Sequence, residues 1–184
     1  MTVFNRNLVD ELNRALPAAA HVQLGTLLAA IQADITALGA TEKLCGAPTL
    51  VIKAGSSPTV KSSTSFSAVA AGVAQTKAAN TDMAALVGTL ATAKSALWAF
   101  YIDRDGTLTT SSKTADAATN AAALKLKPAV PPGKVEIGYI IVSNATGSNF
   151  VGGTTALDTA NVTVTYVNNP AFTPASAAAA LSLI

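Results

Sequence analysis

Two uninterrupted apolar runs constrain the fold of this chain more than any other feature. They cover residues 96–102 and 137–142, and the second includes one glycine, Gly138. Neither approaches the roughly 20 residues that a helix needs to cross a bilayer. Short apolar runs bounded by turn residues are typical of buried strands. The sequence therefore predicts a β-rich core and no membrane partner.

Turn residues follow the first run directly. Arg104, Asp105 and Gly106 separate it from an alternating segment at 107–111, which predicts a β-hairpin. Other segments rich in Val, Ile and Thr, or bounded by turns, predict strands at 50–52, 65–71, 73–78, 135–143 and 162–167, with a short helix at 115–124. We therefore expect a mainly β fold, an antiparallel β-sandwich or barrel-like domain, over residues 48–170.

The first 47 residues predict a helical N-terminal extension. Five apolar residues recur there with a spacing of 4, 3, 4 and 3; we call Leu24, Leu28, Ile31, Ile35 and Leu38 the apolar stripe. It lasts about two heptads, so it is compatible with one amphipathic helix packing on its own domain or with self-association. Mixed Leu and Ile at both core positions favour a trimer over a simple dimer. These residues are the candidate oligomer interface.

The charge content excludes further classes of protein. Only 12% of residues are charged, half the usual share, and the net charge is +2. A disordered chain would carry more charge, and a nucleic-acid partner would call for a stronger basic field. The last segment, residues 171–184, has no charged side chain. We expect this C-terminal tail to dock on its own subunit or on a neighbour.

Few residues are suited to metal or acid–base chemistry. The chain has one cysteine, Cys45, and one histidine, His21, which excludes an internal disulfide framework and a multi-cysteine zinc site. We interpret Cys45 as a small apolar filler. The N-terminus lacks a positive segment followed by an apolar one, so no secretory signal is expected. We predict no cofactor, no metal and no catalytic residue.

One motif supports an alternative of another class. The apolar strand ending in Asp103-Arg-Asp105-Gly-Thr107 resembles the first motif of haloacid-dehalogenase-type phosphatases. That resemblance implies Asp103 as nucleophile and Asp105 as general acid. Such chemistry also needs a Ser or Thr in a second motif, a Lys, an acidic pair for Mg²⁺ and a parallel sheet. The acidic residues after position 110 are only Asp116, Glu136 and Asp158, no two of which are near each other in sequence, and the later sequence lacks regular strand–helix alternation. Asp and Gly also favour tight hairpin turns, and we prefer that interpretation.

A glycine-rich segment between two expected strands could be mistaken for a phosphate-binding loop. Gly147, Gly152 and Gly153 have part of the required spacing, but Gly153 stands where the phosphate-contacting Lys would be. We interpret these glycines as permitting a tight loop.

Three pieces between residues 98 and 168 resemble a β-domain of structural proteins from tailed-bacteriophage virions. They are the aromatic strand leading into Asp105-Gly-Thr-Leu-Thr109, the strand after Pro131-Pro-Gly-Lys134, and the loop Phe150-Val-Gly-Gly-Thr-Thr-Ala-Leu-Asp158. The last of these is the most specific. The resemblance covers well under half of the chain and leaves out the N-terminal helices.

This resemblance implies a non-enzymatic structural protein located in the virion and assembled in the host cytoplasm. Low charge and abundant small side chains suit a subunit whose surface is largely covered by neighbours. We expect a capsid decoration, cement or head-fibre subunit that forms a homo-oligomer and contacts the major capsid protein or other virion proteins. A tail, neck or baseplate component is the alternative within this class.

Overall fold

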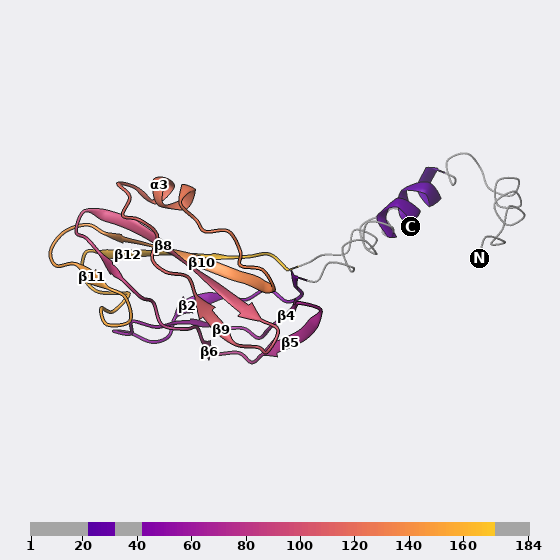
Figure 1. The fold of residues 1–184 in the computed structure, drawn as a ribbon, viewed down its shortest axis with the longest axis horizontal. Coiled ribbons are helices and arrows are strands. Elements are labelled where there is room, and N and C mark those ends of the chain that lie inside the picture. Colours follow the sequence, from indigo (N-terminus) through magenta and orange to yellow (C-terminus); the bar gives the residue numbers. More distant parts are fainter. Residues whose placement is uncertain (1–21, 32–41, 172–184) are drawn as a thin grey trace, which may run out of the picture. The chain divides into compact units, whose positions relative to one another are not determined.

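The structure, a computed structural model, describes residues 22–31 and 42–171 (Figure 1). Residues 22–31 are helical and belong to one compact unit of the chain, and Thr41–Phe172 form a second. The second unit, which we call the β domain, contains twelve short strands in antiparallel sheets. The expected mainly β fold is confirmed.

The central sheet has four strands in the order β12-β10-β8-β9. β8 (Lys94–Asp103) and β10 (Lys134–Asn144) form its centre, with β9 (Leu108–Thr110) and β12 (Val162–Asn168) at its edges. Both central strands match the two apolar runs in the sequence.

The remaining strands form three smaller sheets. One has the order β1-β4-β5, the second β2-β3-β6, and the third pairs β7 with β11. Their bounds are β1 (Lys43–Leu44), β2 (Leu50–Ile52), β3 (Val60–Ser62), β4 (Phe66–Ala70), β5 (Val73–Lys77), β6 (Thr81–Asp82), β7 (Thr89–Leu90) and β11 (Phe150–Val151).

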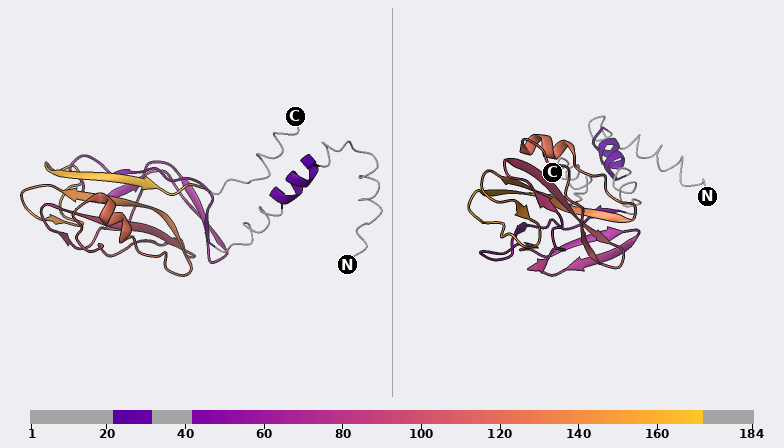
Figure 2. Two further views of the ribbon diagram at one scale, coloured as in Figure 1. Left: turned by 90° about the horizontal axis from the view of Figure 1, so that it is seen from above. Right: turned by 60° about the vertical axis from the view of Figure 1, so that its left-hand side comes forward.

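β8 is apolar from residue 96 to residue 102 because both of its faces are covered there. Trp98 and Phe100 belong to the main core, together with Phe66 and Val60 from the smaller sheets. The alternate residues of β8, beginning with Leu97, belong to a second cluster with Ala123 of helix α3 (Asn120–Lys125). Figures 1 and 2 show α3 on one side of the central sheet and the smaller sheets on the other. A strand buried on both faces has no polar alternation, which explains the uninterrupted run.

β10 contains a bulge directly after its one acidic residue, Glu136. Glu136 pairs with Tyr101 and Gly138 pairs with Phe100, so Ile137 is the extra residue. Ile137 joins the main core, while Glu136 lies opposite Tyr101, whose side chain belongs to the α3 cluster. At Gly138 the backbone of β12 approaches so closely that a Cβ would lie 2.4 Å from the carbonyl oxygen of Val167. The bulge and this glycine together fix the register of the central sheet.

Several local predictions are confirmed. β8 and β9 form the expected hairpin, and β4 and β5 form a second hairpin at the two segments expected to be strands. The expected helix at 115–124 is shorter and begins later, because Thr119 caps α3 by accepting a hydrogen bond from the amide of Ala122. The glycine-rich segment between β10 and β12 contains one short strand that we did not predict, β11, which pairs with β7.

The start of the β domain and the environment of Cys45 differ from the sequence interpretation. β1 pairs with β4, so Lys43 and Leu44, which we assigned to the N-terminal extension, form part of the β domain. Leu44 is buried, whereas Cys45, which directly follows β1, is exposed. The interpretation of Cys45 as an apolar filler is therefore wrong.

The described chain enters and leaves the β domain at the same end, which we call the base. Glu42, Leu44 and Pro170 line one cavity there. β10 runs away from the base, and the long connection from β10 to β12, which includes β11, lies at the opposite end of the domain (Figure 1). We call this opposite end the distal end.

Candidate functional site

The apolar stripe lies partly within the described helix. Leu24, Leu28 and Ile31 are four and three residues apart, so they share one helical face. Leu24 is half-buried, while Leu28 is 58% and Ile31 39% exposed. Ile35 and Leu38 lie outside the described residues. In the described helix, two of the three stripe residues are therefore exposed to solvent.

Asp103 and Asp105 lie at the turn of the β8–β9 hairpin. The Asp103 carboxylate accepts hydrogen bonds from the amides of Asp105, at 3.0 Å, and Thr107, at 2.8 Å. Gly106 has a φ of +77°, which suits a glycine. These contacts are the hairpin chemistry that the sequence analysis preferred, and the sheet is antiparallel rather than the parallel one that the phosphatase motif requires.

The glycine-rich loop packs tightly against another loop of the domain. A Cβ on Gly152 would lie 3.0 Å from Leu86, and Gly153 is equally close and has a φ of +72°. The loop follows β11 and continues into a turn rather than into a helix. Gly152 and Gly153 thus lie in a tight turn, as the sequence predicts, whereas a Cβ on Gly147 would meet no atom within 4 Å.

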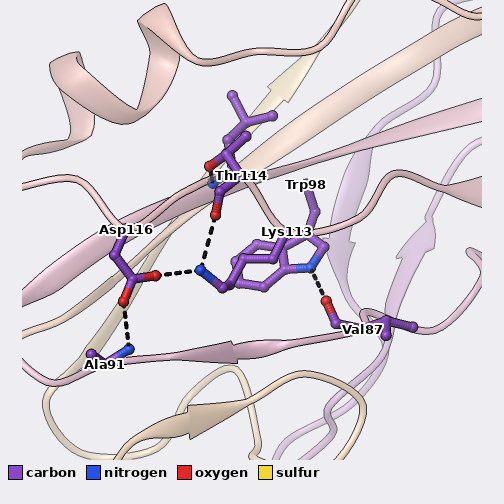
Figure 3. Close-up of polar contacts among 7 residues, drawn as sticks. Val87, Ala91, Trp98, Lys113, Thr114 and Asp116 are labelled. Carbon is purple, nitrogen blue, oxygen red and sulfur yellow. Dashed lines mark hydrogen bonds and ion pairs between the residues drawn. The ribbon is translucent and has the colours of Figure 1, made fainter.

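A polar clamp joins two loops beside β8 (Figure 3). The Lys113 ammonium contacts the Asp116 carboxylate and donates a hydrogen bond to the Thr114 carbonyl, and Asp116 accepts a hydrogen bond from the amide of Ala91. The hydrogen bond from Lys113 is the main reason why the pKa of Asp116 is lowered. All three contacts hold loops in place and point to a structural role.

A second ion pair joins Lys127, in the linker that follows α3, to the buried side chain of Glu136. The Glu136 side chain is 4% exposed, and one of its oxygens lies 2.6 Å from the Lys127 ammonium. Among the described residues, that oxygen has no conventional hydrogen bond, so Lys127 is its main stabilising neighbour. The same ammonium lies 4.9 Å from the centre of the Tyr139 ring. Burial, with the nearby Glu136 charge, raises the pKa of Tyr101.

Neither ion pair was predicted from the sequence, although both left a signal. Lys113 and Asp116 are three residues apart in a loop, and Glu136 is a carboxylate beside an apolar run. Such a carboxylate needs a partner, but the sequence does not say which lysine provides it.

Across the described residues, no group of three or more His, Cys, Asp and Glu side chains is arranged to hold a metal ion. In the same part of the chain, no helix is both long enough and apolar enough to span a membrane. His21 and residues 172–184 of the expected tail lie outside the described residues.

Two cavities mark the two ends of the β domain. The cavity at the base has a volume of about 530 Å³ and is lined by both charged and apolar side chains, including Lys134 and Val130. The cavity at the distal end has a volume of about 220 Å³ and lies between the two halves of the β10–β12 connection.

Comparisons with protein families, with curated proteins and with solved structures found no match to this chain.

Proposed function

We propose that this protein is a non-enzymatic structural subunit of a tailed-bacteriophage virion, of the capsid decoration, cement or head-fibre type. It works as a homo-oligomer, with a trimer favoured, and its partners are the major capsid protein or other virion proteins. The observation that carries the assembly part of this proposal is the exposed face of helix 22–31, where Leu28 and Ile31 meet solvent.

Apolar helical faces are normally buried, and burial of apolar surface contributes roughly 25 cal/mol per Å². Copies of the chain that associate through this face would recover that free energy. The 4-3 spacing of Leu24, Leu28 and Ile31 suits packing between helices.

The organisation of the β domain supports a role in display. Its described ends lie together at the base, so anchoring the N-terminal segment leaves the distal loops directed away from the attachment point. Its buried ion pair and its turn carboxylate serve structural contacts. A rigid module attached at one end suits decoration of a particle.

The assembly part is tested by light scattering on the full chain. Leu28→Lys places a charge in the shared face, and we expect it to reduce the mass of the oligomer to that of a monomer. Thr26→Lys is the matched control, because Thr26 lies on the opposite face of the same helix and is exposed. If the unmodified protein is a monomer at high concentration, the proposed oligomer does not exist.

The virion part is tested by immunogold electron microscopy with an antibody against the β domain. We expect label on the heads of phage particles from the host in which the gene is expressed. Label confined to the tail or neck would replace the decoration role with the alternative one. Particles that carry no label would contradict the virion location.

A further inference from the structure

The distal cavity is built by a single connection of the chain. Two segments of the β10–β12 connection line it, one before β11 and one after it. The first segment supplies Asn144, Thr146, Gly147, Ser148, Asn149 and Phe150, and the second supplies Thr155, Thr159, Ala160, Asn161 and Val162.

Backbone and side-chain hydrogen bonds hold these walls in position. The amide of Ala145 donates to the carbonyl of Asn161 at 2.9 Å, which continues the β10–β12 ladder beyond its last pair. The amide of Val151 donates to the Thr155 hydroxyl at 3.0 Å. The cavity is therefore formed before any ligand arrives, which lowers the entropy cost of binding.

A buried amide contributes to the lining. Asn144 is 2% exposed, and its Nδ2 donates a hydrogen bond to the Ser148 carbonyl at 3.0 Å. This bond fixes the orientation of the amide. Its Oδ1 accepts no hydrogen bond from the described part of the chain, so it remains available as an acceptor.

The other groups of the lining are neutral and donate as well as accept. The Thr155 hydroxyl already accepts a bond from Val151, so its own proton is free to be donated. Thr159 and Asn161 add exposed hydroxyl and amide groups, and Ala160 and Val162 add apolar surface. None of the lining residues carries a charge. A charged ligand would lose hydration there without gaining an ion pair.

We propose that this cavity binds one ring of a neutral carbohydrate. Sugar hydroxyls both donate and accept hydrogen bonds, and the C–H groups of the ring provide apolar surface. A sugar therefore matches both the polar groups and the apolar surface of the lining. The volume of about 220 Å³ is below the ~300–1,000 Å³ typical of drug-sized ligands, which suits a single ring. This binding site does not depend on the proposed virion role.

The test is a titration of the ¹⁵N-labelled full chain with glucose, galactose, mannose and N-acetylglucosamine, followed by two-dimensional NMR. We expect at least one sugar to cause saturable shifts confined to the amides of residues 144–149 and 155–162. A concentration of about 50 mM is enough to occupy most of a site whose Kd is near 10 mM. Absence of saturable shifts with all four sugars would overturn the proposal, as would shifts spread over the whole domain.

Two variants connect the shifts to the cavity. Ala160→Tyr fills the space and should abolish the shifts, while Ala74→Tyr, at an exposed position on β5, should leave them unchanged. Thr159→Val removes one hydroxyl at nearly constant size and should weaken binding about threefold to tenfold. If neither Ala160→Tyr nor Thr159→Val weakens binding, the sugar binds elsewhere. Glucuronate binding as tightly as the best neutral sugar would contradict a neutral site.

Discussion

The β domain and helix 22–31 differ in how far their apolar side chains are buried. In the β domain, Trp98 and Phe100 have no exposed surface, and the Trp98 ring meets Phe150 edge-on with the ring centres 6.0 Å apart. On the helix, Leu28 is more than half exposed. The first region completes its own core, whereas the second presents a face that another surface can cover. The chain therefore combines a domain with a buried core and a described helix with an exposed apolar face.

The strongest test of this difference is removal of residues 1–41. We expect the shortened chain to keep its β structure, because every residue of the domain core among the described residues lies at or after Leu44. Association should be lost completely, because the apolar stripe is gone. Circular dichroism and light scattering measure the two outcomes separately. A shortened chain that unfolds would show that the β domain depends on the N-terminal segment.

A substitution in the core tests whether the β domain is stabilised by its own packing. Trp98→Ala removes a fully buried ring and the hydrogen bond from its Nε1 to the Val87 carbonyl (Figure 3). We expect the free energy of unfolding to fall by about 3–5 kcal/mol, measured by urea denaturation with circular dichroism. Val151→Ala, at an exposed position on β11, should change it by no more than about 0.5 kcal/mol. Equal effects of the two variants would contradict the packing described for Trp98.

Local chemistry explains which parts of this fold could be predicted. The β8–β9 hairpin follows from Asp105 and Gly106, because the turn type depends on residues adjacent in sequence. β10 and β12 were predicted from an apolar run and from alternation. The spacing of Leu24, Leu28 and Ile31 likewise gave their shared face before the structure did. Each of these predictions depends only on residues that are close together in the sequence.

Features that depend on distant contacts were missed. β11 and β7 have two residues each, and they are paired where Phe150 packs against Trp98. The distal cavity forms because β10 pairs with β12 and brings both ends of their connection together. The bulge at Ile137 that places Glu136 opposite Tyr101 also has no local sequence signal. Tertiary packing, rather than propensity, determines all three.

The ion pair between Lys127 and Glu136 is a further difference between the β domain and helix 22–31. Residues 22–31 contain no charged side chain. Lys127→Met leaves the Glu136 carboxylate buried without its cation, and we expect a loss of roughly 3 kcal/mol in the free energy of unfolding. A double variant with Glu136→Met as well should recover most of that loss, since two apolar side chains can replace a buried pair. Chemical denaturation of the single and double variants measures both effects. If the single variant is as stable as the unmodified protein, Glu136 is solvated rather than buried.

The smallest expected effect concerns acid stability and the polar clamp. The pKa of Asp116 is lowered from 3.8, chiefly by the hydrogen bond from Lys113, while partial burial acts in the opposite direction. As pH falls, the unfolded chain therefore takes up this proton first. The stabilisation is fully present above the ordinary carboxyl pKa and is lost as pH falls through the lowered pKa of the folded state.

Asp116→Asn should therefore reduce stability at neutral pH by at most about 1 kcal/mol and flatten its decline in acid. Thermal unfolding between neutral and acidic pH measures this slope. Asp105→Asn is the control, because the side chain of Asp105 is 81% exposed and its ion-pair distance to Arg104 is 3.9 Å. An unchanged acid slope in Asp116→Asn would show that the Lys113 contact adds nothing to folding. Association through the helix should be the same in both variants, because the clamp belongs wholly to the β domain.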